Sequence, residues 1–215
     1  KSAELDKIAK VGKRTDPDLE AIANLKPDLI LINNTNKKDE VYESLAKIAP
    51  TVVTEGTGIN WKQDFLLIAA ALGTTEKAEK LMDEYNTKAK SVGQKAGSEK
   101  TFSFLYASAD RTRIFAKSSF VGSICVDASL ARPAAAQVEK TSVDLSSEQL
   151  DQADGDYLFY GVQGGDESKL TGEALWSTLK AVTEKHAHSV DSDMFFLNAG
   201  PAAALGVLET IEKAL

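Results

Sequence analysis

The chain has 215 residues, of which 43% are hydrophobic, and it carries a formal net charge of −7 with a pI near 5.0. This content is enough for one large or two small cores, while the acidic balance without a basic tract argues against nucleic-acid binding. The longest apolar stretch, residues 65–72, is far shorter than the ~20 residues that a membrane span needs.

The first clear unit of the sequence is a helix followed by a buried strand. Thr15 or Asp16 can cap the helix, and Pro27 ends it because the residue before a proline avoids helical angles. The apolar run Leu29–Ile32 then predicts a strand that is buried on both faces in a parallel sheet. The chain turns polar at Asn33, at the carboxyl end of this strand, where open α/β sheets hold their ligands.

A similar unit occurs again later in the chain. Glu148 and Asp156 stand 128 residues after Glu20 and Asp28, and the segments around them share the order of helix, breaker and apolar strand. Two such copies can arise by chance in any doubly wound protein. The alternative, which we favour, is that the chain forms two similar α/β lobes.

Helical patterns dominate the region between the two copies. A helix over 39–48 and a strand over 51–54 complete the first copy, and two helices follow over 61–72 and 76–92. Because only Gly73 interrupts the latter two helices, we predict a long, stiff connection between the lobes. The predicted domains are an N-terminal lobe over 1–60, a helical linker over 61–97 and a C-terminal lobe over 98–215.

The C-terminal lobe shows alternating strand and helix patterns. Ser118 or Ser119 can cap a helix that turns Cys125 inward, and this lone cysteine is most simply a small buried hydrophobe. A single cysteine also excludes an internal disulfide and a cysteine-rich metal site. Strands are predicted over 101–106, 157–160 and 186–190, and a closing helix over 201–215.

No assembled catalytic or metal-binding pattern occurs in the sequence. His186 and His188 share one face of a predicted strand, but no other histidine exists to complete a zinc site. We interpret both as solvated strand residues. The motifs GxSxG, HExxH, Walker A and GxGxxG are absent, which favours a binding protein, with an enzyme on a two-lobed scaffold as the alternative.

Two of the four arginines share a single loop. Arg111 and Arg113 follow the strand over 101–106, and Lys117 is close behind them. Guanidinium groups suit planar, delocalised anions. Either this loop holds an anion, or its two arginines pair with Asp110 or with surface carboxylates. The aromatic residues that can lie at the same edge, or pack in the core, are Tyr106, Phe115, Phe195 and Phe196.

Five segments, in order, resemble the substrate-binding proteins of iron-siderophore and cobalamin ABC importers. The resemblance covers nearly all of residues 11–215. It implies an α/β protein whose two lobes, with mostly parallel sheets, are joined by a long α-helical linker, with a ligand cleft between the lobes. The segments are TDPDLEAIANLKPDLIL, SSFVGSICVDASLARP, the unit from SSEQL to YLFY, EALWSTLKAV and AGPAAALGVLETIEKAL.

The resemblance also implies a function. Such a protein captures a ferric siderophore outside the cytoplasm, in the periplasm or lipid-anchored at the cell surface, and delivers it to an ABC permease in the membrane. Cobalamin or haem is the alternative ligand. We expect a monomer that is not an enzyme, has no cofactor of its own and supplies no direct metal ligand.

Site residues are carried over from the family position by position. The resemblance places acidic docking residues for the permease at Asp39 or Glu40 and at Glu167, which stands 128 residues after Asp39. It also implies a further strand and helix before residue 11, so we expect the first lobe to be incomplete at its start. Met194 stands where the family often has an aromatic residue. The expected ligand-binding residues are Asn33, Trp61, Tyr106, Arg111, Arg113, Lys117, Met194, Phe195 and Phe196.

Overall fold

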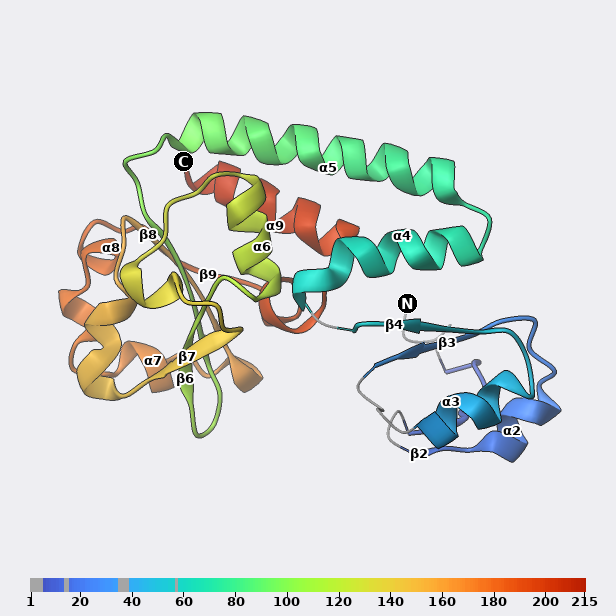
Figure 1. Ribbon diagram of the computed structural model, residues 1–215. Coiled ribbons are helices and arrows are strands. Elements are labelled where there is room, and N and C mark those ends of the chain that lie inside the picture. Colours follow the sequence, from blue (N-terminus) through green and yellow to red (C-terminus); the bar gives the residue numbers. More distant parts are fainter. Residues whose placement is uncertain (1–5, 14–15, 35–38, 57) are drawn as a thin grey trace. The chain divides into compact units, whose positions relative to one another are not determined.

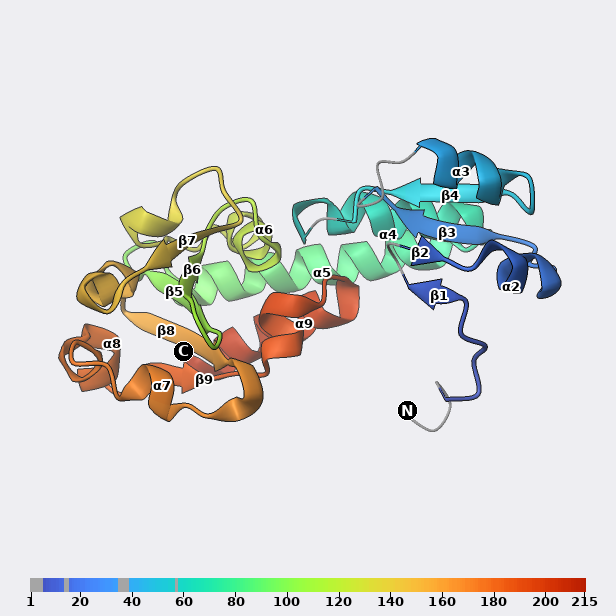
Figure 2. The same ribbon diagram turned by 90° about the horizontal axis from the view of Figure 1, so that it is seen from below.

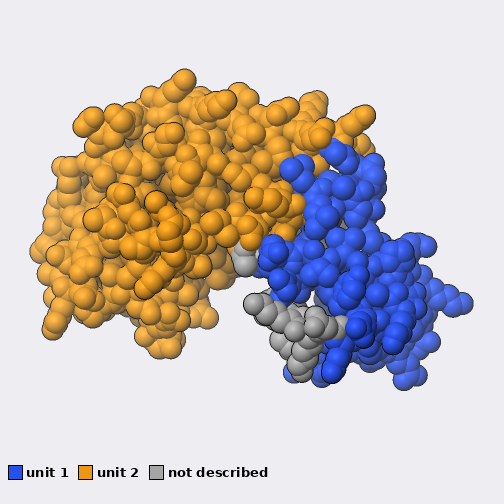
Figure 3. All heavy atoms as spheres, viewed as in Figure 1, with its two compact units in different colours: residues 1–56, 66–75 blue, residues 57–65, 76–215 orange. Residues whose placement is uncertain are grey.

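The chain divides into two compact units in the computed structural model (Figures 1 and 3). Unit 1 contains residues 1–56 and 66–75, and unit 2 contains residues 57–65 and 76–215. The boundaries of the two lobes and the linker that the sequence suggests, at residues 60 and 97, stay a prediction. The structure describes residues 6–13, 16–34, 39–56 and 58–215.

Unit 1 is a small α/β structure. Its elements are β1 (Gly12–Lys13), β2 (Asp16–Pro17), α2 (Leu19–Asn24), β3 (Ile30–Asn33), α3 (Asp39–Ala46) and β4 (Thr51–Thr54). β3 and β4 pair in parallel, and β1 and β2 pair antiparallel. The strand predicted over 29–32 is therefore present, but Leu31 is 44% exposed, so the prediction that both faces are buried was wrong.

The cap of α2 differs from the prediction. Asp18 is the N-cap, and its carboxylate accepts a hydrogen bond of 2.9 Å from the backbone N–H of Ala21. Asp16 belongs to β2 instead, where Lys13 is its partner, and Thr15 lies outside the described residues. The helix consequently begins after Pro17 rather than around it.

Two long helices follow, as predicted. A short 3₁₀ turn, η1 (Gly58–Asn60), leads into α4 (Trp61–Ala71), and α5 (Thr75–Ala96) comes next. Gly73 joins the two helices with a φ of +66°, a left-handed conformation that glycine adopts without steric cost. None of the helices in the described part of the chain combines the length and the apolar character that crossing a membrane requires.

Unit 2 is built on a five-stranded sheet with the order β7-β6-β5-β8-β9. β5, β8 and β9 are parallel, whereas β6 runs antiparallel to both of its neighbours. The expected α/β class with a mostly parallel sheet is confirmed. The strands are β5 (Phe102–Ala107), β6 (Thr112–Phe115), β7 (Ser142–Leu145), β8 (Tyr157–Val162) and β9 (Ala187–Ser189).

Helices cover this sheet on both faces (Figure 2). Side chains of α5, α6 and α9 pack with Phe102, Phe104 and Tyr106 in an aromatic core, in which Cys125 is buried as predicted. Leu105 and Leu158 point to the opposite face. Besides η1, the start of α4 and nearly all of α5, the helices of unit 2 are α6 (Phe120–Asp127), α7 (Ser168–Thr171), α8 (Lys180–Thr183), α9 (Pro201–Ala214), the 3₁₀ helices η2 (Ala134–Ala136), η3 (Ser147–Ala153), η4 (Gln163–Gly165) and η5 (Trp176–Thr178), and the π-helix η6 (Asp193–Leu197).

Each of the two histidines stacks on an aromatic ring of β8. His186 stacks on Tyr157 with ring centroids 4.7 Å apart, and His188 stacks on Phe159 at 5.4 Å. Burial lowers the pKa of His188, and its Nε2 atom has no hydrogen-bond partner in the described structure. The interpretation as a solvated residue was wrong for His188, because the parallel register sets it beside Phe159 of β8. The side chain of His186 is 39% exposed, which agrees with the interpretation.

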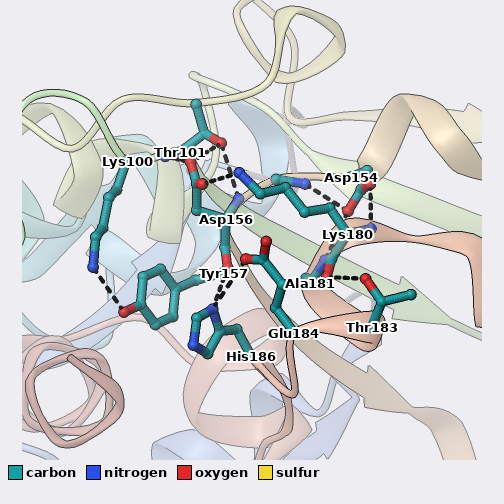
Figure 4. Close-up of polar contacts among 11 residues, drawn as sticks. Lys100, Thr101, Asp154, Asp156, Tyr157, Lys180, Ala181, Thr183, Glu184 and His186 are labelled. Carbon is teal, nitrogen blue, oxygen red and sulfur yellow. Dashed lines mark hydrogen bonds and ion pairs between the residues drawn. The ribbon is translucent and has the colours of Figure 1, made fainter.

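A carboxylate network joins the amino-terminal ends of β5 and β8 (Figure 4). The carboxylate of Asp156 accepts hydrogen bonds from the backbone N–H and the hydroxyl of Thr101, at 2.8 and 3.0 Å, and pairs with Lys180 at 2.6 Å. The neighbouring Asp154 accepts from the N–H groups of Lys180 and Ala181 at the start of α8. The hydrogen bond from Lys180, followed by those from Thr101, lowers the pKa of Asp156 to about 2.

We predict that Asp156→Asn destabilises unit 2 by about 1 kcal/mol at neutral pH, after allowing for solvent screening. The folded pKa lies below the unfolded value, so this stability is present above pH ~4 and is lost as the pH falls towards 2. Denaturant unfolding at pH 7 and pH 3 measures the difference. Asp151→Asn, at an exposed position of η3, is the control, and an equal deficit at both pH values would contradict the assignment.

Candidate functional site

A group of charged and aromatic side chains gathers on one face of the sheet of unit 2. The register places Arg113 of β6 opposite Tyr106 of β5 on one side and opposite Asp144 of β7 on the other. Arg111 stands two residues before Arg113, so it projects to the same face. We call the set Tyr106, Arg111, Arg113, Phe115, Asp144 and Phe196 the arginine–aromatic cluster.

Arg113 lies over aromatic rings. The central carbon of its guanidinium is 5.4 Å from the ring centroid of Tyr106 and 5.7 Å from that of Phe115, within the range of cation–π attraction. Its Nε atom is buried and has no hydrogen-bond partner in the described part of the chain. Because an unsatisfied buried donor costs about 1–3 kcal/mol, this group is suited to a partner that arrives from outside.

The aromatic rings of the cluster form a packed base. Phe196 contacts Phe115 and Tyr106 with centroid distances of 4.9 and 5.4 Å. Tyr106 and Phe196 are 4% and 9% exposed, so they support Arg113 from beneath. Phe195 packs against Phe104 inside the core and is 1% exposed, which agrees with the alternative that it is a core residue.

Arg111 pairs with the surface carboxylate of Asp144, in agreement with the alternative that the sequence left open. Its Nε and Nη2 atoms donate to the carboxylate of Asp144 at 3.1 and 2.9 Å, and Nη2 also reaches the second oxygen at 2.9 Å. Asp110 instead accepts a hydrogen bond from the hydroxyl of Ser108 at 3.2 Å. The hydrogen bond from Arg111 lowers the pKa of Asp144, and the charge of Arg113 lowers it further.

The other predicted ligand residues of unit 2 lie in different surroundings. Lys117 pairs with Glu139 at 3.1 Å on the surface. Met194 is half-buried, and its backbone N–H donates to the carboxylate of Asp191 at 2.9 Å. Neither side chain belongs to the arginine–aromatic cluster as we define it.

Trp61 is buried in the core of unit 2. Its indole N–H donates to the hydroxyl of Ser123 at 3.1 Å, and its ring meets those of Tyr85 and Phe120 edge to face. With 3% of its surface exposed, this indole is satisfied by the protein itself. Asn33 ends β3 in unit 1, and its role in ligand binding stays a prediction.

The carboxyl ends of β8 and β9 border a cavity of about 420 Å³ that Tyr106 also lines. Glu167 lies in its wall, where its carboxylate accepts hydrogen bonds from Tyr160 at 3.1 Å and from Ser189 at 2.5 Å. Burial, followed by the hydrogen bond to Glu167, raises the pKa of Tyr160 to about 12. Sequence reasoning did not foresee this cavity, although the polar residues Gln163–Glu167 after a buried strand were its signal.

A second cavity, of about 570 Å³, lies in unit 1 along β3. Most of its lining side chains are apolar, among them Ile22, Leu25, Leu31 and Leu45, so it offers little to an anion. In the described part of the chain no group of three or more His, Cys, Asp or Glu side chains could hold a metal ion.

Arg132 provides an internal comparison for Arg113. It is 7% exposed, and its Nε and Nη2 atoms donate to the backbone carbonyls of Phe102 and Phe115 at 2.7 and 2.6 Å. Its guanidinium also lies over the ring of Phe104 at 5.0 Å. Arg132 therefore links β5 to β6 through two backbone carbonyls, although its Nη1 atom is also buried without a partner in the described residues. The guanidinium of Arg113 has no such pair of carbonyl partners there, and its Nε atom is the buried donor left unsatisfied.

We predict opposite effects on stability for the same substitution at these two positions. Arg132→Met should lower the free energy of unfolding by about 2–4 kcal/mol, because two buried carbonyls lose their donors. Arg113→Met should leave it within about 1 kcal/mol of the wild type or raise it, as expected for a residue kept for binding. Denaturant unfolding of both variants tests this, and an equal loss would mean that Arg113 is also structural.

Comparison with known proteins agrees with this architecture. The family described as "Periplasmic binding protein" matches residues 1–194. The chain is 34% identical to the probable siderophore-binding lipoprotein YfiY of Bacillus subtilis, covering 95% of this chain and 68% of that protein. It is 29% identical to the iron(3+)-hydroxamate-binding protein FhuD of the same organism, covering 97% and 68%.

A solved structure is similar over the whole chain. The crystal structure of Staphylococcus aureus SirA complexed with staphyloferrin B superposes with a TM-score of 0.83 and 27% identity, covering 99% of this chain and 80% of SirA. The family match, the relatives and the shared fold agree with one another. The chain belongs to the periplasmic binding protein family.

Proposed function

We propose that this protein captures a ferric siderophore and delivers it to the permease of an ABC importer. The observation that carries the proposal is Arg113, a guanidinium with an unused buried donor above aromatic rings. The names of the relatives support a ferric chelate over the cobalamin or haem alternative, because YfiY is described as siderophore-binding and FhuD as iron(3+)-hydroxamate-binding.

In this proposal Arg113 donates hydrogen bonds to the oxygen atoms of the chelate, which carry its negative charge. Such charge-assisted bonds are stronger than neutral ones, and a guanidinium can donate two of them in parallel. Iron arrives already coordinated by the siderophore, so the protein needs to supply no iron ligand and no cofactor. Binding and release involve no covalent step, which makes the protein a carrier rather than an enzyme.

Further contacts are proposed from the family resemblance. Asn33, Lys117 and Met194 are the additional candidates, and Tyr106 and Phe196 form the base beneath Arg113. We leave Trp61 and Phe195 out of the site, because both are buried in the core of unit 2. The site is expected to work in a monomer outside the cytoplasm, in the periplasm or on a lipid anchor.

Docking on the permease is assigned to carboxylates of both units. Glu40 is exposed in the first turn of α3, and Glu167 is held by Tyr160 and Ser189. The side chain of Asp39, the other candidate in unit 1, lies outside the described part of the structure. Carboxylates in these places can pair with arginines of a permease.

Binding of a ferric chelate is the first test. Tryptophan fluorescence should be quenched by at least one member of a panel of ferric hydroxamate, catecholate and citrate chelates. Arg113→Ala should weaken the best ligand by about 1.5–3 kcal/mol, or roughly 10- to 150-fold, for a lost charge-assisted hydrogen bond. Lys90→Ala, at an exposed lysine of α5 in the same unit, is the control, and no response to the whole panel would refute the proposal.

Docking is tested by separating uptake from affinity. Glu40→Gln and Glu167→Gln should lower uptake of the ferric chelate by cells that express this protein with its permease, while the affinity for the chelate in solution changes less than about twofold. Glu43→Gln, at an exposed position one turn along α3, should leave both unchanged. Normal uptake in the variant that combines Glu40→Gln with Glu167→Gln would show that other residues dock on the permease.

A further inference from the structure

The two arginines of the arginine–aromatic cluster differ in their ion pairing. Arg111 is held by both oxygens of Asp144 at 2.9 Å, in the forked geometry that a carboxylate and a guanidinium share. Arg113 forms no ion pair in the described structure, although it stands directly opposite Asp144 in the register of β6 and β7. The carboxylate of Asp144 therefore pairs with Arg111 and acts on Arg113 through its charge alone.

The charge of the cluster follows from this arrangement. The two guanidinium groups and the one carboxylate of the cluster carry a net charge of +1. The carboxylate of Asp110 also acts on Arg111 through its charge but accepts its hydrogen bond from Ser108. The carboxylate of Asp144 is 59% exposed, so it faces the same solvent from which a ligand approaches Arg113. An anion bound to Arg113 is attracted by the guanidinium of Arg113 and repelled by the neighbouring carboxylate of Asp144, because the two carry charge of the same sign.

We propose that Asp144 is a specificity-determining residue of the ferric-siderophore site. By neutralising Arg111 it leaves a single uncompensated positive charge, so the site selects ferric chelates of low net charge over trianionic ones. Specificity of this kind comes from a repulsive element placed beside an attractive one. The inference rests on the proposed function, because it concerns the choice among chelates at that site.

The test compares two iron complexes of different charge, a neutral ferric tris-hydroxamate and a trianionic ferric tris-catecholate. For Asp144→Asn, we expect the affinity for the trianionic complex to rise about tenfold, which corresponds to ~1.4 kcal/mol, while that for the neutral complex changes less than about twofold. Asp110→Asn is the matched control, because it removes one carboxylate charge from the turn that carries Arg111 and leaves the Arg111–Asp144 pair intact.

A double-variant cycle separates charge balance from direct contact. Arg111→Gln should weaken binding of the trianionic complex, since Asp144 is then uncompensated, and adding Asp144→Asn should restore it to within about threefold of the wild type. The inference is overturned if the double variant stays as weak as Arg111→Gln, or if Asp144→Asn matches Asp110→Asn. A wild type that binds neither these two complexes nor any other chelate of the panel would refute the proposed function itself, which is a different result.

Discussion

The parallel pairing of β5 with β8 is the constraint on which unit 2 depends. Every residue of both strands is buried, and the register aligns Phe102 with Tyr157 and Phe104 with Phe159. These rings stack in pairs at 5.1 and 5.4 Å and give α5, α6 and α9 an aromatic surface to cover. The same strand β5 then holds β6 on its other edge, so the packing of the core decides where Arg113 lies.

The three arginines of unit 2 are satisfied in different ways. Arg132 is enclosed and donates to two backbone carbonyls, Arg111 is exposed and paired with a carboxylate, and Arg113 lies over aromatic rings without a carbonyl or carboxylate partner in the described residues. Arg113 and Arg132 each keep one buried donor without a partner there. One residue type thus serves as a brace, as part of an ion pair and as a candidate ligand anchor. The surroundings that the sheet creates determine which of these roles each arginine takes.

Much of the secondary structure was predictable, because it depends on local patterns. The apolar runs gave β3 and β4, and the breaks around Gly73 located α4 and α5. The cap of α2 was misplaced because Thr15, Asp16 and Asp18 are all acceptable caps in sequence, and only the pairing of β1 with β2 decides among them.

The arrangement of the candidate site was harder to predict, because it depends on strand register. Asp144 is the partner of Arg111 although the two are 33 positions apart, and nothing local in the sequence links them. His188 was misjudged for the same reason, since its stacking partner Phe159 lies on β8. The scarcity and spacing of the arginines identified Arg111 and Arg113 as a pair, but they could not say that Arg111 is already paired with a carboxylate.

Cys125 has a practical consequence. The only thiol of the chain is 2% exposed inside the aromatic core, and burial raises its pKa, so little of it is the reactive thiolate at neutral pH. A cysteine engineered on the surface would therefore react with a maleimide dye, while the native cysteine stays unlabelled. Single-site labelling beside Arg113 needs no cysteine-free background.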